Sequence, residues 1–480
     1  MRSCCAAHAT LLLTILSTFG VADDAHPGRP NILFVLVDDF GPRDLSCYGS
    51  ELYETPQMDA LAASGARFTQ AYVAYPRCVP SRFAILTGKH PAGFQKDRDS
   101  VHVELDRDVT FGQAFQQAGY KTFYCGKWHL GEGPSDPSRV GFSHTVAAGG
   151  AGATRSHFAP YTKSRNGGQG EQEAIVGLDD APEDEYLTDR LTAETLKFID
   201  SNRDGPFLAV LAHYAVHTPL EAKQHLTRRY AEKLEGVELP EQVFEPESAG
   251  ENLIVQNNPT YAAMIESVDH GVGRLLRLID RLKIADHTIV VLASDHGGLS
   301  ARGGKREVAT SNRPFRAGKG HLYEGGLRIP LLIRWPGHTQ AGRVIDEPVI
   351  SMDLFPTFLE IAGLPLRPEA HRDGVSLAGL LDGDAPPQSR NFFWHNPAPR
   401  PSSTADLFSS AVRSGNLKLV EFPTENRTEL YDLQTDISEA HNLAADRPDD
   451  VTRLQAELHE WKQTVGAANV PRLRKKELRR

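Results

Sequence analysis

The sequence lacks an excess of basic residues and has the composition of neither a disordered nor a multispanning protein. Its 52 Lys and Arg against 62 Asp and Glu give a formal net charge of -10, which argues against a broadly basic nucleic-acid-binding surface. With 40% hydrophobic and 24% charged residues, a disordered or collagen-like chain is also excluded. A length of 480 residues fits one large α/β domain with a smaller appendage, or two to four ordinary domains.

An apolar stretch over residues 6–21 follows Met1-Arg2 and stops before Asp23-Asp24. This order is typical of a cleaved signal peptide. A membrane anchor is the alternative, but the stretch is shorter than the roughly 18–20 apolar residues that a spanning helix needs. We therefore expect a signal peptide over residues 1–22, a periplasmic or secreted protein, and no membrane insertion after cleavage.

Cysteine is rare. Cys4 and Cys5 precede the apolar stretch, so they should leave with the signal peptide. Cys47, Cys78 and Cys125 remain, and an odd number in a compartment that permits disulfides leaves at least one free, modified or paired outside the chain. Cys78 is the candidate. The other two either form a bridge or fill buried apolar space.

The alternation of apolar runs with amphipathic segments predicts an α/β fold. The near-continuous apolar run over residues 32–37 is typical of a strand buried on both faces. A helix follows, with Thr55 as its N-cap, Pro56 at its first position and Gly65 as its stop. Further helices are predicted over residues 110–118 and 260–282, and strands over residues 121–125, 206–212 and 288–293. We expect a large, mostly parallel or mixed sheet flanked by helices, in a domain over residues 29–375.

The texture of the sequence changes after about residue 375. Short apolar runs on either side of the Ser414-Gly415-Asn416 turn predict a hairpin, and residues 451–464 predict an amphipathic helix. We expect a smaller antiparallel α+β domain over residues 376–470, followed by a basic, solvated tail over residues 471–480.

Polar side chains stand just past four of the apolar runs. In open α/β sheets, ligands bind beyond the carboxyl ends of the strands, so these side chains should converge. Any one of them alone is more often a helix cap, a solvated lysine or a satisfied histidine. Their coincidence at four strand ends indicates a site. They are Asp38, Asp39, Lys127, His129, His217, Asp295 and His296.

The three carboxylates of this group predict a metal ion. Brought together, Asp38, Asp39 and Asp295 would repel one another unless their pKa values rise or a cation neutralises them. Oxygen ligands suit Ca²⁺ or Mg²⁺ best, while His296 also admits Mn²⁺ or Zn²⁺. We expect one divalent ion, Ca²⁺ in the first place, with Mg²⁺ or Mn²⁺ as the alternatives.

The segment Cys78-Val79-Pro80-Ser81-Arg82 precedes an apolar helical pattern. Pro80 at the first helical position places Cys78 just before a helix N-terminus, where backbone N–H groups and the helix dipole favour an anion. Arg82 adds a fixed positive charge. The plain alternative is a structural cysteine, but a chance match to four fixed positions is rare, on the order of one in a few hundred chains of this size.

With these residues the chain resembles the formylglycine-dependent type I sulfatases of the alkaline phosphatase superfamily, over about residues 29–445. Segments spread along the whole chain carry the resemblance in the same order. They are Arg29-Pro30-Asn31, Asp38-Asp39, the segment from Cys78 to Arg82, Leu86-Thr87-Gly88, the segment from Gly126 to Leu130, His217-Thr218-Pro219, the segment from Ser294 to Gly297, Gly318-Lys319-Gly320 and the segment from Glu429 to Leu433.

The resemblance implies an alkaline-phosphatase-like fold in which a formylglycine-generating enzyme oxidises Cys78, and the formylglycine hydrate is the nucleophile. In this family pattern His217, assisted by Lys319, protonates the departing alcohol, and His129 takes a proton as sulfate leaves. Many relatives carry Asn where this chain has His296, which bears on the identity of the metal. The implied metal ligands are Asp38, Asp39, Cys78, Asp295 and His296, and the implied catalytic residues are Cys78, Arg82, Lys127, His129, His217 and Lys319.

A sulfated saccharide, of galactose or N-acetylgalactosamine type, is the predicted substrate, because residues 156–161 also resemble exported polysaccharide sulfatases. Trp394 and His395 either contact sugar or belong to an interdomain core. Two alternatives stay open. One is a phosphonate monoester or phosphodiester hydrolase of the same superfamily, and the other is a non-catalytic glycan-binding protein in which Cys78 stays a thiol.

Overall fold

The computed structural model describes residues 28–95, 101–104, 107–161, 175, 177–384, 388–469 and 471. The predicted signal peptide over residues 1–22, and all of the predicted basic tail except Pro471, lie outside these ranges. Among the described residues, no helix is both long and apolar enough to cross a membrane.

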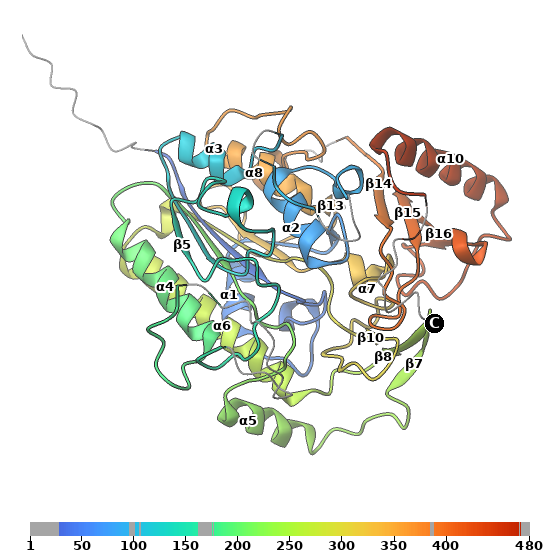
Figure 1. Ribbon diagram of the computed structural model, residues 1–480, viewed down its shortest axis with the longest axis horizontal. Coiled ribbons are helices and arrows are strands. Elements are labelled where there is room, and N and C mark those ends of the chain that lie inside the picture. Colours follow the sequence, from blue (N-terminus) through green and yellow to red (C-terminus); the bar gives the residue numbers. More distant parts are fainter. Residues whose placement is uncertain are drawn as a thin grey trace, which may run out of the picture.

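Within the described ranges, eight strands form one mixed sheet at the centre of the larger part of the molecule (Figure 1). Strand β1 pairs in parallel with β9 and β6, whereas β11 runs antiparallel to β9 and β2. The sheet is therefore mixed, which confirms the predicted fold class. In sheet order the strands are β12 (Arg343–Ile345), β2 (Ala66–Phe68), β11 (Leu331–Arg334), β9 (Thr288–Ser294), β1 (Asn31–Val37), β6 (Phe207–Ala212), β4 (Lys121–Gly126) and β5 (His144–Val146).

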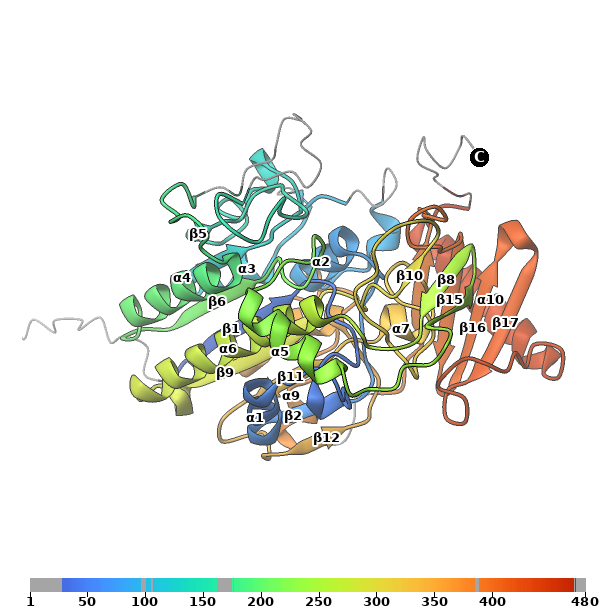
Figure 2. The same cartoon turned by 90° about the horizontal axis from the view of Figure 1, so that it is seen from below.

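Helices cover both faces of this sheet (Figures 1 and 2). Along β1 the side chains alternate, so that Phe34 and Leu36 lie in one apolar cluster while Leu33 and Val35 lie in the other. All four are almost completely buried, as the apolar run predicted. On the Phe34 face lie α2 (Cys78–Thr87), α3 (Phe111–Gln117), α8 (Leu354–Ile361) and α9 (Ala378–Asp382). On the other face lie α1 (Pro56–Ser64), α4 (Leu187–Ser201), α5 (Gln224–Leu234) and α6 (Pro259–Arg281).

The helix boundaries follow ordinary capping chemistry. The side chain of Thr110 accepts a hydrogen bond from the backbone N–H of Gln113, and Oε1 of Gln113 accepts one from the backbone N–H of Thr110, so a capping box begins α3. The side chain of Asn258 accepts from the first backbone N–H groups of α6, and proline occupies its first position. The predicted helices over residues 110–118 and 260–282 therefore form with ends shifted by one residue.

Several short strands had no signal in the sequence. A strand of two to four residues leaves no periodicity to detect, and two of the three pairings here join segments that are distant in the chain. These strands are β3 (Ala71–Tyr72), which pairs with β13 (Val349–Ile350), and the three-stranded set β10 (Ala301–Arg302), β8 (Gly250–Leu253) and β7 (Phe244–Glu247).

A second sheet, antiparallel and four-stranded, lies beside the large one (Figure 2). Its strands are β14 (Phe392–Asn396), β15 (Ser409–Ser414), β16 (Leu417–Phe422) and β17 (Arg427–Asp432). Leu454 and Leu458 of α10 (Pro448–Val465) pack on Val412 and Leu419 of this sheet. The domain boundary at residue 375 stays a prediction, and α9, just past it, packs on α8 of the larger part.

Trp394 belongs to the core between the two sheets. It is fully buried, its Nε1 donates to the carbonyl of Val73 at 2.7 Å, and its ring centre lies 5.5 Å from that of Tyr72. His395 is also fully buried, with Nδ1 2.9 Å from Oγ of Ser410. Of the two interpretations left open by the sequence, the core is therefore correct and a sugar contact is excluded for both residues.

The three described cysteines are free thiols. Cys47 and Cys125 do not form the disulfide that the sequence left open, and both pack in the apolar cluster that contains α6. Burial raises the pKa of Cys47 to about 12 and raises that of Cys125 above its ordinary value. Neither thiol is activated, which leaves Cys78 as the chemically distinct one.

Candidate active site

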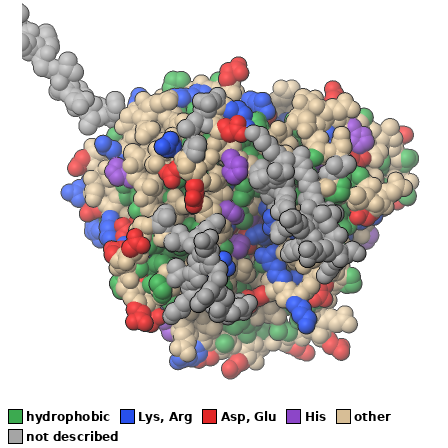
Figure 3. Space-filling view, in the orientation of Figure 1, with side chains coloured by type: hydrophobic (Ala, Val, Ile, Leu, Met, Phe, Trp, Pro, Cys, Tyr) green, Lys and Arg blue, Asp and Glu red, His purple; other side chains and the backbone are tan. Residues whose placement is uncertain are grey.

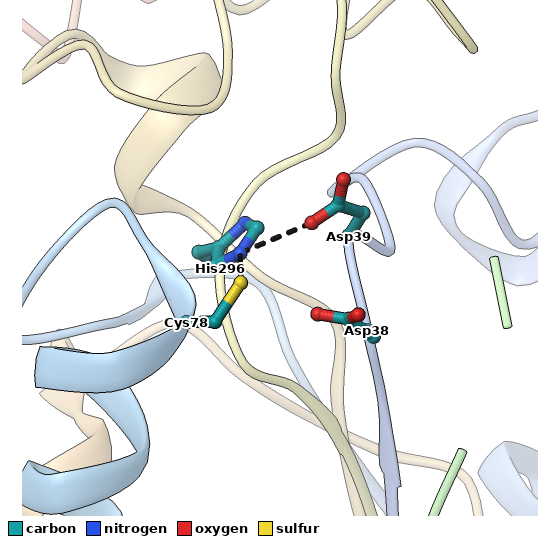
Figure 4. A group of neighbouring side chains, drawn as sticks. All are labelled: Asp38, Asp39, Cys78 and His296. Atoms are coloured by element: carbon teal, nitrogen blue, oxygen red, sulfur yellow. Dashed lines mark hydrogen bonds and ion pairs between the residues drawn. The ribbon is translucent and has the colours of Figure 1, made fainter. Parts of the chain in front are cut away.

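The carboxyl ends of β1 and β9 meet the N-terminus of α2 at one point (Figure 4). Asp38 and Asp39 follow β1 directly, His296 follows β9, and Cys78 begins α2. Four potential ligand atoms, one from each of these buried residues, lie within 4.8 Å of one another. The four side chains point toward a common space. Asp295 adjoins them, with Oδ1 3.5 Å from Nε2 of His296.

The position of Cys78 corrects a detail of the sequence prediction. Cys78 is the first residue of α2 and Arg77 is its N-cap, whereas the sequence placed Cys78 before the helix and Pro80 at its first position. A proline within the first turn removes a backbone N–H that has no helical partner, so it fits there at no cost. The side chain of Cys78 therefore stands at the positive end of the helix dipole.

Two lysines lie beside the aspartates. Nζ of Lys127 donates to Oδ2 of Asp38 at 2.5 Å, and Nζ of Lys319 donates to Oδ1 of Asp39 at 2.6 Å. The same Nζ of Lys319 lies 3.8 Å from Sγ of Cys78. Both lysines are almost completely buried, so they act on these groups through little intervening water.

Arg82 lies against the third carboxylate. Its Nε donates to Oδ2 of Asp295 at 2.9 Å and its Nη1 donates to the carbonyl of Lys127 at 2.5 Å. The side chain is 1% exposed. Arg82 is therefore a buried positive charge that pairs with Asp295.

The charges of the site oppose one another strongly. Burial and the neighbouring Asp295 raise the pKa of Asp38 well above its ordinary value. Burial also raises the pKa of Asp39, but Lys319, His217 and His296 together outweigh burial and bring that pKa below its ordinary value. Although burial raises the pKa of the Cys78 thiol, the two lysines hold it well below its ordinary value.

The donor set fits a divalent cation. Among the described residues, Oδ1 of Asp38 and Oδ2 of Asp39 are buried and accept no hydrogen bond, which is costly for a carboxylate unless a cation meets it. Nδ1 of His296 lies 3.0 Å from the carbonyl of Gly297 and donates to it, so the lone pair of Nε2 faces the aspartates. Nε2 is 3.1 Å from Oδ1 of Asp39. Aspartate oxygens and a histidine nitrogen together suit Ca²⁺, Mg²⁺ or Mn²⁺.

Two histidines flank the group. Burial lowers the pKa of His129, and Cys78 counters this with a hydrogen bond. Nε2 of His217 lies 3.9 Å from Oδ2 of Asp39, while its Nδ1 donates to the carbonyl of Thr218 at 2.6 Å. Burial and the nearby Lys319 lower the pKa of His217 to about 3. Both imidazoles are therefore neutral before an anion enters.

The structure thus brings together all the residues predicted as metal ligands or catalytic groups, including those named only by resemblance, while their individual roles stay predictions. Sequence reasoning missed the residues that hold them. Glu221 accepts hydrogen bonds from the backbone of His157 and from the hydroxyl of Ser156, both at 2.8 Å. Nε2 of His157 in turn lies 3.1 Å from the carbonyl of His217. Ser156 and His157 belong to the segment 156–161 that carries a resemblance, but nothing in the sequence indicated Glu221 or these contacts, because they join loops that are distant in the sequence.

Comparisons with known proteins agree with this geometry. The family model "Sulfatase" matches residues 30–364, and the model "N-sulphoglucosamine sulphohydrolase, C-terminal" matches residues 317–465. The chain is 31% identical to the steryl-sulfatase of Mus musculus over 465 residues, covering 81% of this chain and 70% of the relative. It is 32% identical to the N-acetylgalactosamine-6-sulfatase of Sus scrofa over 410 residues, covering 80% and 72%.

A solved structure shares the whole architecture. Ps i-CgsB in complex with k-i-k-neocarrahexaose superposes with a TM-score of 0.75 at 28% identity, covering 94% of this chain and 96% of that chain. A family model that spans well over half of the chain leaves no doubt about the family. The chain belongs to the sulfatases: it is a type I sulfatase of the alkaline phosphatase superfamily, an enzyme that hydrolyses sulfate esters.

Proposed function

We propose that this sulfatase is formylglycine-dependent and acts on sulfated carbohydrate. The position of Cys78 carries the proposal. Its Sγ is 3.2 Å from Nε2 of His296 and 3.8 Å from Nζ of Lys319, at the start of a helix. In the family that the motif resembles, the cysteine at this position matures to formylglycine. Sγ then stands where an oxygen of the mature side chain would be.

A formylglycine hydrate at residue 78 supplies two hydroxyl groups on one carbon, one to attack sulfur and one to release sulfate as the aldehyde re-forms. An unmodified thiol offers no such exit. A formylglycine-generating enzyme is therefore a required partner during biogenesis.

Asp38, Asp39, Asp295 and His296, with residue 78 as a further ligand, would hold a divalent ion, which would supply positive charge toward the sulfate oxygens and lower the pKa of the attacking hydroxyl. We propose Ca²⁺ as this ion, with Mg²⁺ or Mn²⁺ as the alternatives. Together with His296, Arg82 lowers the pKa of Asp295, and its contact with Oδ2 orients that carboxylate.

The two lysines hold the substrate anion. Lys127 and Lys319 both lie close enough to residue 78 to act on its charge, and their ammonium groups donate to the non-bridging oxygens of the sulfate. Because both are buried and already anchored to aspartates, no reorganisation is needed when negative charge develops.

The two histidines move protons. His217 donates a proton from Nε2 to the departing alcohol, and the anionic sulfate beside it favours the protonated imidazole that this requires. His129, which burial keeps neutral, accepts the proton released from residue 78 as sulfate leaves.

Carbohydrate as the substrate, of galactose or N-acetylgalactosamine type, is supported by two of the similar proteins. One is an N-acetylgalactosamine-6-sulfatase and the other was solved with a neocarrahexaose. The signal-peptide pattern over residues 1–22 supports a periplasmic or secreted enzyme.

The experiment is an activity panel on protein made together with a formylglycine-generating enzyme. Its probes are 4-nitrophenyl sulfate, galactose 6-sulfate, N-acetylgalactosamine 6-sulfate, a steroid sulfate and a phosphonate monoester. We expect sulfate release, with kcat/KM highest on a sulfated sugar. Preference for the steroid sulfate or the phosphonate would contradict the proposed substrate class.

Substitution at residue 78 tests the nucleophile. Cys78→Ser and Cys78→Ala should each lower kcat by roughly 10³-fold or more, because neither side chain can form the hydrate. Cys47→Ser, at a cysteine away from the site, should keep the wild-type rate. Near-normal turnover by either residue 78 variant would contradict a formylglycine mechanism.

A further inference from the structure

Two segments distant in the sequence meet beside the site. The backbone N–H of Gly303, just past β10, donates to the carbonyl of Ser403 at 3.1 Å. A Cβ built on Gly303 would lie 1.5 Å from the carbonyl oxygen of Pro401, so only glycine permits this approach. The backbone from which Arg306 projects is therefore fixed against residues 401–403.

Arg306 is anchored without being neutralised. Its Nη1 donates to Oγ of Ser403 at 2.9 Å, and the side chain is only partly exposed. In the part of the chain that the structure describes, no carboxylate lies within 4 Å of this guanidinium. The neighbouring Arg77, by contrast, forms an ion pair: its Nη2 donates to Oδ2 of Asp406 at 2.5 Å.

Residues 400–406 also pack close to residue 78. Asp406, which pairs with Arg77, also accepts a hydrogen bond from the backbone N–H of Arg400 at 3.2 Å. Arg77 directly precedes Cys78. A Cβ on Gly320, next to Lys319, would lie 2.6 Å from Oδ1 of Asp406. Residues 400–406 thus pack between the start of α2 and the loop that carries Lys319.

The charges around Arg306 place it within electrostatic range of the reaction centre. Burial lowers the pKa of Arg306, Asp39 raises it, and Arg400 and Arg77 lower it further. Arg306 therefore lies within electrostatic range of Asp39 and Cys78, as well as of two other arginines. Figure 3 shows Lys, Arg and His side chains gathered near the middle of one face of the molecule.

We propose that Arg306, held by Ser403, binds a second anionic group of the saccharide, beside the sulfate that is cleaved. A guanidinium matches a sulfate ester or a carboxylate through two parallel hydrogen bonds. Lys127 and Lys319 already face residue 78 and hold the scissile sulfate, so Arg306 meets another group. The inference rests on the proposed function and narrows it to a saccharide with a second sulfate or a uronate.

The test compares Arg306→Gln with the wild type on probes that differ in charge. They are 4-nitrophenyl sulfate, which has one anionic group, glucosamine 2-N,6-O-disulfate, which has a second sulfate, and a monosulfated disaccharide with a uronate. The ratio of kcat/KM for the better doubly charged probe to that for 4-nitrophenyl sulfate should fall about 10- to 100-fold, chiefly through KM. Whichever probe loses more identifies the second group as sulfate or carboxylate.

Controls separate binding from folding. Lys305→Gln removes an exposed neighbouring cation and should leave the ratio unchanged. Arg306→Lys keeps the charge but loses the planar fork, so an intermediate ratio is expected. The melting temperature of each variant shows whether the packing of residues 303 and 401–403 has survived.

A binding measurement makes the outcome independent of turnover. Calorimetry compares Cys78→Ala with the double variant Cys78→Ala/Arg306→Gln for glucosamine 2-N,6-O-disulfate and for the uronate disaccharide. Kd should rise about 10- to 100-fold for at least one of them and less for galactose 6-sulfate.

Three results are decisive. A selective loss on doubly charged probes supports the inference. An equal loss of kcat/KM on 4-nitrophenyl sulfate would place Arg306 on the scissile sulfate. No loss on any probe would show that Arg306 has no role in binding. Either of these two results would overturn the inference. If the wild type releases no sulfate although residue 78 is converted, the proposed function fails, while calorimetry still reports on Arg306.

Discussion

The imidazole of His129 lies directly over the backbone of Gly152. A Cβ built on Gly152 would stand 2.2 Å from Nε2 and 2.4 Å from Cε1 of this ring. His129 itself has a φ of 60°, in the left-handed region that non-glycine residues rarely adopt. The position of the proposed proton acceptor therefore depends on the absence of a side chain at residue 152.

Gly152→Ala should displace the ring and lower kcat on 4-nitrophenyl sulfate by about 10- to 100-fold, because a misplacement on the order of 1 Å is enough. The melting temperature should change little, since the ring can move toward the substrate space. Gly205→Ala is the matched control, because a Cβ there meets no atom within 4 Å. Unchanged kcat in Gly152→Ala would show that the position of His129 does not matter for turnover.

Chelation should abolish activity and lower the melting temperature by several degrees, because a bound ion stabilises the folded state and its loss leaves Asp38 and Asp39 close together and uncompensated. Adding Ca²⁺ should restore both. Elemental analysis and thermal unfolding of the same sample check this. The variant Asp38→Asn should show a smaller thermal response to Ca²⁺ than the wild type, and full activity in metal-free protein would contradict the site.

A buried carboxyl that is not among the predicted site residues makes stability depend on pH. Asp269 of α6 is fully buried and accepts hydrogen bonds from the backbone of Gln57 and Met58 at 2.8–3.2 Å. Burial outweighs these bonds and raises the pKa of Asp269 to about 7. Between about pH 4 and pH 7 the folded state keeps a proton that the unfolded state has lost, so the free energy of unfolding falls as the pH rises.

This group should contribute a fall of about 4 kcal/mol at most between pH 4 and pH 8, and Asp269→Asn should remove it. Urea denaturation at several pH values gives the two slopes. Asp280→Asn, on the exposed face of the same helix, should leave the slope as it is in the wild type. Equal slopes in Asp269→Asn and the wild type would show that Asp269 is already ionised at low pH.

The sequence predicted the elements whose signal is local. The apolar run before Asp38 indicated a central strand, and strand ends at Asp38 and Asp295 indicated where side chains converge. The sequence could not predict roles that arise from contacts between distant parts of the chain. Neither the clearance that His129 needs at Gly152 nor the contact of Arg306 with Ser403 leaves any periodicity or motif, because each joins loops whose approach is set by the packed sheets.

Both the sequence and the structure indicated that Cys78 is chemically distinct. The sequence offered a rare motif at a helix start, and the structure places its thiol 3.2 Å from Nε2 of His296 within a buried set of aspartates and lysines. Roles for individual residues came from resemblance, because spacing alone does not say which group gives a proton and which takes it.

The mass of the tryptic peptide over residues 78–82, taken from protein made with a formylglycine-generating enzyme, tests the account most directly. We expect this peptide about 18 Da lighter than the cysteine form, with the converted fraction proportional to kcat on 4-nitrophenyl sulfate across preparations. A peptide that keeps the full cysteine mass in preparations with undiminished sulfatase turnover would contradict it.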